Sequence, residues 1–458
     1  MHRNLTPGLW NKFLGRMLGV ALLVGAASMA AAQDNTGLPN YQGPGVASLG
    51  AGNVGLRSGE QAELRYYAGV SGVVDTNLQP FELDAQGNLL RIHNLYGVQV
   101  NGGVYGMHRW KRALLGLDYG GNYHRYVNSN SYNGSDQHLN LGYTLEASRR
   151  WTLDLHESVG TFSIATSELA TAPTNDPNSV FTPSTLLFDS RTSFLQSSAY
   201  ATYLQSARTS FTVGGSGFLQ DQKAAGLSNS GGYTLTGSMQ HRMSKATTLG
   251  VNYSYSHFEF PAFHSNSDSN TYHGTFATGL GQFWTFSVEA GITVSEVNSQ
   301  LTFALNPELA ALFGVPSITE NSYTKTIYPS GAATLERKFR RANLAFHYTR
   351  GLFSGNGASG TGREENAEMS FSYTGIRRLN LGVNGGHYKL VSIGQNTGTF
   401  ATYAGSAGIT YTLGRGISVV ARYSVNQLQL DVGNYARTST GAILGLMFSP
   451  GNIPLALW

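Results

Sequence analysis

The chain has 458 residues, a formal net charge of +4 and no cysteine. Only 12% of its residues are charged, about half the fraction of roughly 25% in an average soluble protein, while 57 residues are glycine and 11% are aromatic. These values exclude thiolate metal sites and cysteine nucleophiles, and a mean hydropathy of −0.18 is too polar for a bundle of membrane-spanning helices.

The N-terminus has the features of a secretory signal peptide. Residues 1–16 carry three Lys or Arg, and the apolar stretch 17–27 that follows is too short to span a bilayer. Small residues before Ala32 predict cleavage after it, so residues 1–32 would be removed. The remaining 27 basic and 26 acidic residues leave a net charge of about +1. We therefore expect no nucleic-acid partner.

Residues 33–60 are rich in Gly, Asn and Pro and are expected to form a flexible periplasmic arm. The segment "GAGNVG" at 50–55 matches the G-x-G-x-x-G pattern of dinucleotide sites. No clear strand precedes it and no helix follows it, so a linker is the favoured interpretation. The arm is also too short to form the plug of an outer-membrane transporter.

The rest of the chain alternates apolar and polar residues with a period of two, which is typical of β-strands with one apolar face. In the segment after Arg150, Trp151 and Leu153 lie on one face, and Asp154 and His156 lie on the other. We predict about eighteen strands, with sixteen as the alternative. The expected ranges are 61–74, 91–109, 112–127, 135–148, 151–165, 190–205, 208–220, 230–243, 246–260, 270–280, 283–297, 327–339, 342–354, 363–376, 379–391, 398–413, 416–430 and 437–449.

Short, mostly basic turns recur between these strands at a fixed interval. Counting from one turn to the next gives spacings of 39, 58, 37, 37, 59, 37 and 37 residues. Such a period indicates one repeated unit, here a hairpin of two strands, and the two long intervals indicate insertions of about twenty residues. The counted positions are Lys111, Arg150, Arg208, Lys245, Gln282, Arg341, Arg378 and Arg415.

In its hairpin repeat, low charge and alternation of short turns with long loops, the sequence resembles the porin-like bacterial outer-membrane β-barrels. The resemblance is one of architecture and points to no specific named family. It implies an all-β, transmembrane, antiparallel up-and-down barrel over 61–449, with short periplasmic turns, long external loops and a C-terminal tail at 450–458. Porin-like barrels often end in an aromatic residue, as this chain does at Trp458, but Pro450 and Pro454 place it beyond the last strand.

The same alternation predicts which side chains line the lumen. They include acids, bases and histidines, so the lumen is expected to carry charges of both signs. The pore-lining candidates are Glu63, Arg65, Asp118, His124, Glu146, Asp154, His156, Arg242, His273, Glu289, Glu336, His347, Glu368 and Arg422.

Glu157 fits this pattern badly. Strict alternation from Trp151 places its carboxylate on the lipid-facing side, where it would be unfavourable. A β-bulge near Glu157 would restore the phase and turn Phe162 and Ile164 outward instead. The sequence leaves both alternatives open.

The two insertions, 166–189 and 298–326, are the only connections long enough to fold back into the barrel. The first joins the fifth and sixth strands, a position that resembles that of the constriction loop of general porins. The second contains "NPELAALFG", which predicts one or two helical turns. Their apolar residues either pack on one another above the rim or narrow the lumen. The constriction candidates are Glu168, Asp176, Glu308, Leu309, Leu312 and Phe313.

These features favour an outer-membrane channel for passive diffusion of small hydrophilic solutes. The alternative is an export or surface-assembly barrel, for example for exopolysaccharide, and the third possibility is an outer-membrane structural protein or enzyme. We expect no catalytic constellation, no metal site and no cofactor. The expected partners are outer-membrane lipid and lipopolysaccharide, the barrel-assembly machinery, small polar solutes and, as an open possibility, further copies of the chain.

Overall fold

The computed structural model describes residues 65–78, 92–127, 132–162, 191–223, 227–304, 317–353, 360–393, 399–414, 416–431 and 435–449. In this part of the chain, no helix is long and apolar enough to cross a membrane.

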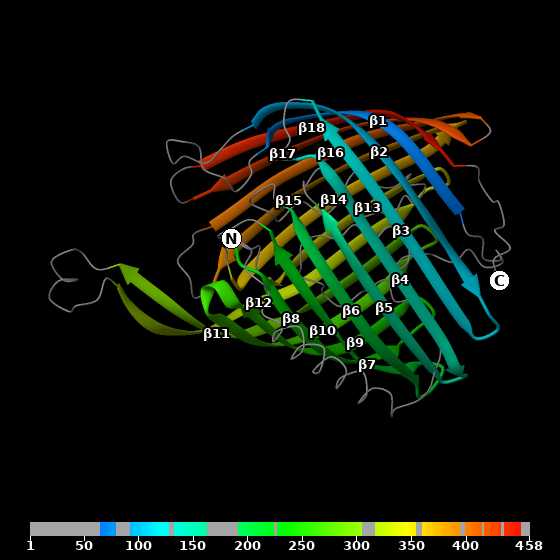
Figure 1. Cartoon of the computed structure of the whole chain (residues 1–458). Coiled ribbons are helices and arrows are strands. Elements are labelled where there is room, and N and C mark those ends of the chain that lie inside the picture. The colour runs from blue at the N-terminus through cyan, green and yellow to red at the C-terminus, as the bar shows by residue number, and fades with distance from the viewer. Residues whose placement is uncertain are drawn as a thin grey trace.

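The described residues form one 18-stranded antiparallel sheet in which each strand pairs with the next one along the chain. The first strand also pairs with the last one, with Ala68 opposite Phe448, so the sheet closes into an up-and-down barrel (Figure 1). This confirms the predicted fold class and strand number. The strands are β1 (Arg65–Leu78), β2 (Ile92–Arg109), β3 (Ala113–Tyr126), β4 (Gly134–Ser148), β5 (Trp151–Phe162), β6 (Thr192–Leu204), β7 (Thr209–Gln222), β8 (Ser230–Arg242), β9 (Thr247–Phe260), β10 (Ser265–Leu280), β11 (Trp284–Ala304), β12 (Ser317–Lys338), β13 (Ala342–Phe353), β14 (Gly362–Ile376), β15 (Leu379–Ser392), β16 (Thr399–Gly414), β17 (Ile417–Leu430) and β18 (Tyr435–Phe448).

The basic turns lie at one end of the barrel, which we call the short-turn end, and the other connections lie at the long-loop end. Each predicted turn joins an even-numbered strand to the odd-numbered strand that follows. Gly281, in the turn between β10 and β11, has a φ of 70°, a left-handed conformation that glycine adopts without steric cost. At the long-loop end, β9 and β10 are joined by the short 3-10 helix η2 (Pro261–Phe263).

The hairpin of β11 and β12 is longer than the sequence predicted. Residues 298–304 and 317–326, expected to be loop, are strand, and they pair in unbroken register as far as Ala304 opposite Ser317. Beyond Asn298, β11 pairs only with β12, so the two strands leave the barrel together at the left of Figure 1. The prediction of a long loop here was wrong because the apolar residues of β11 change from even to odd positions after Val294, which interrupts the pattern of a membrane-spanning strand.

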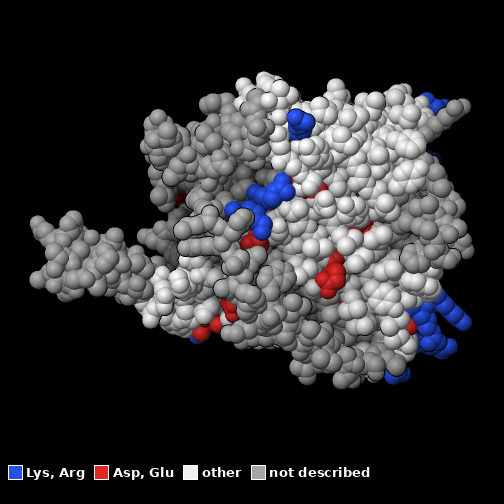
Figure 2. Space-filling model, viewed as in Figure 1, with Lys and Arg blue, Asp and Glu red and all other residues white. Residues whose placement is uncertain are grey.

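The outer face of the barrel is apolar over most of its height. On β11 the outward row runs through Trp284, Val288 and Ile292, as predicted. At the short-turn end the Trp151 ring lies 4.9 Å from that of Tyr203, measured between centroids. Figure 2 shows an outer wall with few charges and a concentration of Lys and Arg at its lower right. This is the surface expected of a barrel in contact with lipid.

Glu157 lies on this outer face. The pairings of β5 with β4 and with β6 run through Glu157 without a shift, and the one irregularity between β4 and β5 lies at Glu146 and Ser148. The alternative of a bulge at Glu157 is therefore wrong. The Ser197 hydroxyl on β6 donates a hydrogen bond of 2.5 Å to the Glu157 carboxylate, which gives this carboxylate one polar partner on the outer face.

Candidate functional site: the lumen of the barrel

The inner face of the barrel is built from the residues that alternate with the lipid-facing ones, and most of it is polar. On neighbouring strands their hydroxyl groups bond to one another across the sheet. Thr271 on β10 bonds to Thr293 on β11 (2.9 Å), and Thr293 donates to Ser330 on β12 (2.8 Å). Ser269 donates to Ser295 in the same way (3.0 Å). These ladders hold the side chains against the wall and give the lumen a hydrophilic lining.

The structure places the predicted pore-lining side chains that it describes on this inner face. Glu63 lies outside the described residues, and Arg65 is described only as the first residue of β1. The residues placed on the inner face are Asp118, His124, Glu146, Asp154, His156, Arg242, His273, Glu289, Glu336, His347, Glu368 and Arg422. By the same alternation along each strand, several charged residues that were not predicted from the sequence also point inward: Asp75, Asp136, His138, Lys338, Glu364 and Arg437.

Two of the lumen histidines are held by hydroxyl groups of a neighbouring strand. His273 is bonded through Nε2 to the Ser330 hydroxyl (2.8 Å), and its Nδ1 lies 3.5 Å from a Glu289 carboxylate oxygen. His347 is bonded through Nδ1 to the Thr334 hydroxyl (2.9 Å). Both rings are thus fixed parts of the wall. In the described residues, no group of three or more His, Asp or Glu side chains has the arrangement of a metal site.

At the long-loop end, apolar residues reach across the lumen. Leu352, at the end of β13, packs in one buried cluster with Phe218 of β7 and with Phe258 and Phe260 of β9. Four strand spacings separate β13 from β9, or about 19 Å along the wall, so this contact requires the end of β13 to lean inward. Phe263 of η2 packs against the same cluster.

Two further contacts bridge the lumen at this end. Ile393, just after β15, packs with Val297 of β11 and Tyr328 of β12. The hydroxyl of Thr361, just before β14, donates a 2.6 Å hydrogen bond to Ser267 of β10, and both residues are buried, at 1% and 0% exposed. Leu352, Thr361 and Ile393 therefore narrow the lumen at the long-loop end. We call the contacts of Leu352, Thr361 and Ile393 the lumen bridge.

The sequence analysis assigned the constriction to other residues and missed the lumen bridge. Glu168, Asp176, Glu308, Leu309, Leu312 and Phe313 lie outside the described residues, so a role for them in narrowing the lumen stays a prediction. One signal was present in the sequence. Phe258 and Phe260 occupy inward positions of β9, where a water-filled lumen would favour polar residues, so they indicated that something packs there.

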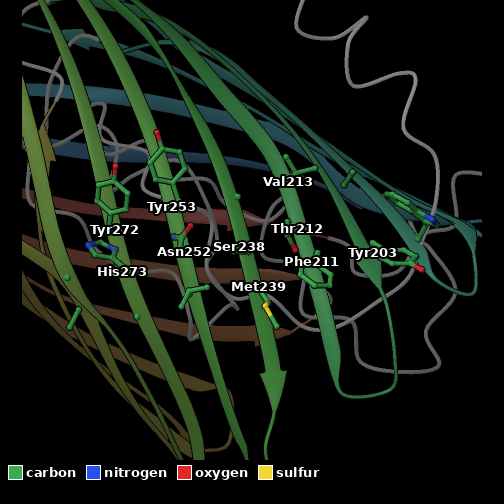
Figure 3. Close-up of a pocket in the computed structure, with 17 residues that line it drawn as sticks. Tyr203, Phe211, Thr212, Val213, Ser238, Met239, Asn252, Tyr253, Tyr272 and His273 are labelled. Carbon is green, nitrogen blue, oxygen red and sulfur yellow. The ribbon is translucent and has the colours of Figure 1, made fainter.

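An open groove of about 960 Å³ lies on the outer wall over β5 to β11 rather than in the lumen. The groove forms where small outward residues leave room between larger ones such as Phe211 and Tyr253 (Figure 3). The small residues are Gly237, Gly274 and Ala290. The groove belongs to the apolar outer face, so it has the character of a surface for hydrocarbon chains rather than for a polar solute.

No protein-family model matches the sequence, and no curated protein matches it. Among the solved structures with some likeness to this chain is the outer membrane protein OpdK of Pseudomonas aeruginosa. OccK2 (OpdF) of Pseudomonas aeruginosa, in complex with glucuronate, is 11% identical with a TM-score of 0.41, and the match covers 85% of this chain and 98% of that one.

Two further structures show a similar degree of likeness. OpdK of Pseudomonas aeruginosa, with vanillate, is 11% identical with a TM-score of 0.38, covering 84% of this chain and 98% of that one. OccAB1 of Acinetobacter baumannii is 10% identical with a TM-score of 0.37, covering 85% and 96%. Likenesses this weak carry no argument about the lumen of this chain, which rests on its own strands and side chains.

Proposed function

We propose that this protein is an outer-membrane channel through which small hydrophilic solutes diffuse passively. The observation that carries the proposal is the two-sided wall of a closed 18-stranded barrel, with an apolar outer face and a hydrogen-bonded polar inner face. Barrels of sixteen to eighteen strands are wide enough to enclose water. In the outer membrane, the short-turn end of the barrel faces the periplasm and the long-loop end faces the outside of the cell.

The lumen bridge limits what passes. Side chains that meet from β13 and from β7 and β9 divide the long-loop end of the lumen, so the open cross-section is smaller than the strand number alone implies. We therefore assign the channel to small solutes such as ions, amino acids and monosaccharides, and not to polymers.

Swelling of proteoliposomes with graded sugars tests this function. Liposomes containing the folded barrel are diluted into isotonic solutions of a pentose, a hexose, a disaccharide and a trisaccharide, and the initial rate of swelling is recorded. We expect rapid swelling with the pentose and the hexose and a steep fall with the larger sugars. Rates equal to those of protein-free liposomes for every sugar, with correctly folded protein, would contradict the proposal.

A further inference from the structure

We propose that this channel favours cations, and that the inner wall formed by β3, β4 and β5 is the surface along which small cationic solutes bind. The inference rests on the proposed channel function and adds a substrate class to it. We call this surface the acidic wall and define it by the inward side chains Asp118, His124, Asp136, His138, Asp154 and His156.

The acidic wall is a column of carboxylates and imidazoles that runs along the barrel axis. Near the long-loop end, His124 Nδ1 lies 3.6 Å from a carboxylate oxygen of Asp136. Further down, His138 Nε2 lies 3.9 Å from Asp118 Oδ2, a distance beyond hydrogen bonding. Towards the short-turn end, Asp154 accepts a 2.8 Å hydrogen bond from the Thr144 hydroxyl. Acidic groups therefore follow one another over most of the height of the wall.

Glycines set the shape of this column. Gly120 of β3 and Gly160 of β5 lie on either side of His138 in the strand register. A Cβ atom at Gly120 would lie 2.4 Å from the His138 ring, so only glycine lets the ring lie over β3, between Asp118 and Asn122. The His138 ring therefore covers the part of the wall between the Asp118 and Asn122 side chains.

Several polar side-chain atoms of this wall, donors as well as acceptors, have no hydrogen-bond partner among the described residues. Asn122 is 2% exposed, and neither atom of its amide has a hydrogen-bond partner. Asp118 Oδ2 is also buried without a partner. Asn122 lies opposite Asp136 in the register, and Asp118 lies opposite Asn140, so these atoms belong to one patch. The carboxylates beside these atoms attract a positively charged solute, such as a protonated amine or a hydrated cation.

The distribution of charge around the barrel points the same way. On the inward positions of β3 to β7, the charged residues other than histidine are all acidic, whereas β2 has Arg109 at an inward position of the register. Arg191, just before β6, donates to the Ser135 carbonyl oxygen (3.0 Å), so one guanidinium lies at the rim of the wall. Around the whole barrel, the inward carboxylates are Asp75, Asp118, Asp136, Glu146, Asp154, Glu289, Glu336, Glu364 and Glu368. The inward Lys and Arg are Arg242, Lys338, Arg422 and Arg437, and Arg65 and Arg109 occupy two further inward positions of the register.

The excess of inward carboxylates over inward Lys and Arg differs from the charge balance of the whole sequence. The chain as a whole has a net charge of +4, of which three charges lie in residues 1–16, and many of its other Lys and Arg residues lie in turns such as those around Arg150 and Arg341. A low-dielectric barrel wall concentrates the field of the groups that it encloses, so the lumen and not the net charge of the chain sets the ion preference.

Reversal potentials in planar bilayers test the inference. A single channel is recorded across a gradient of KCl, and the permeability ratio of K⁺ to Cl⁻ is obtained from the reversal potential. We expect a ratio above unity for the native chain. Substituting D118N, D136N and D154N together should lower this ratio by about threefold or more, because it removes charge from the wall at nearly constant shape.

The matched control is Asp221→Asn, which removes a carboxylate from the outer face of β7, where it pairs with Lys223. It should leave the ratio unchanged. Channels that carry each of the three lumen substitutions alone are also recorded, so that a folding defect of the triple variant does not decide the result. Each single substitution should lower the permeability ratio of K⁺ to Cl⁻ by a part of the full effect.

Each outcome has a distinct meaning. A ratio above unity that falls in the lumen variants and not in D221N supports the inference. A conducting channel with a ratio at or below unity, or one that the lumen variants do not change, overturns the inference and leaves the channel function standing. Folded, inserted protein that conducts no ions overturns the channel function and this inference together.

Discussion

Glu157 shows how much a single residue in this barrel depends on register. Its carboxylate lies on the outer face between the outward residues Leu155 and Val159, with the Ser197 hydroxyl as its partner. The sequence predicted this position from strict alternation but left a bulge open, because only the pairing of β5 with both neighbouring strands excludes one. A carboxylate facing hydrocarbon keeps part of its desolvation cost even with one hydrogen bond.

We therefore expect Glu157→Leu to stabilise the folded barrel by about 1 kcal/mol, since an apolar side chain replaces a polar one on the lipid face. The measurement is the free energy of unfolding from urea titrations in lipid vesicles. A loss of stability would show that the Glu157 carboxylate has a favourable environment and that its outward assignment is wrong.

Val288 and Ser287 are neighbours on β11 that face opposite sides of the wall. Val288 belongs to the outward row, and Ser287 lies on the lumen side opposite Ala277 and Thr334. We expect Val288→Arg to destabilise the barrel by roughly 2–4 kcal/mol and Ser287→Arg to cost much less, because only the first places a charge in hydrocarbon. Equal costs for both variants, measured by urea unfolding in vesicles, would contradict the assignment of the two faces.

At the scale of elements, the sequence predicted the hairpin unit well because two local signals coincide. Basic turns such as the one at Arg341 recur at a fixed spacing, and apolar alternation is strong wherever a strand crosses hydrocarbon. The extended part of β11 and β12 was missed because the apolar residues of β11 change from even positions, up to Val294, to odd positions from Val297 onward, which interrupts the pattern of a membrane-spanning strand. The lumen bridge was missed because it joins residues far apart in the sequence, and a local pattern contains no information about such contacts.

The lumen bridge is expected to limit the conductance of the channel. Replacing Leu352 and Ile393 together by alanine removes the apolar contacts that these residues make with β9, β11 and β12. We expect single-channel conductance in planar bilayers to rise, because the long-loop end of the lumen widens.

The control for the lumen bridge is Phe346→Ala, which removes a large side chain from the outer face of β13. It should leave conductance unchanged. A double variant that folds, inserts and conducts as the native chain does would show that the bridge does not limit the flow of ions.

At the scale of the whole molecule, the barrel is closed by the pairing of β1 with β18. This pairing joins residues from opposite ends of the chain, such as Val74 and Ala442. The chain has no cysteine, so a pair introduced here is the only thiol pair present. Paired positions on adjacent strands lie close enough for a disulfide or a short thiol cross-linker.

We expect Val74→Cys with Ala442→Cys to cross-link in the folded barrel and to change its mobility on a denaturing gel after oxidation. The control pair, Val74→Cys with Leu444→Cys, lies on the same face but two residues out of register, and it should cross-link far less. Equal cross-linking of both pairs, or none in either, would contradict the observed closure.

The most direct test of the account is to ask whether ions pass through the lumen that the strands define. Ser287→Cys and Val288→Cys are recorded in planar bilayers while a charged, water-soluble thiol reagent is added. If the inner face lines the conducting path, the current through the Ser287→Cys channel falls in steps, and that through Val288→Cys does not change. Block of the Val288→Cys channel together with an unaffected Ser287→Cys channel would contradict the assigned faces, and the channel proposed here with them.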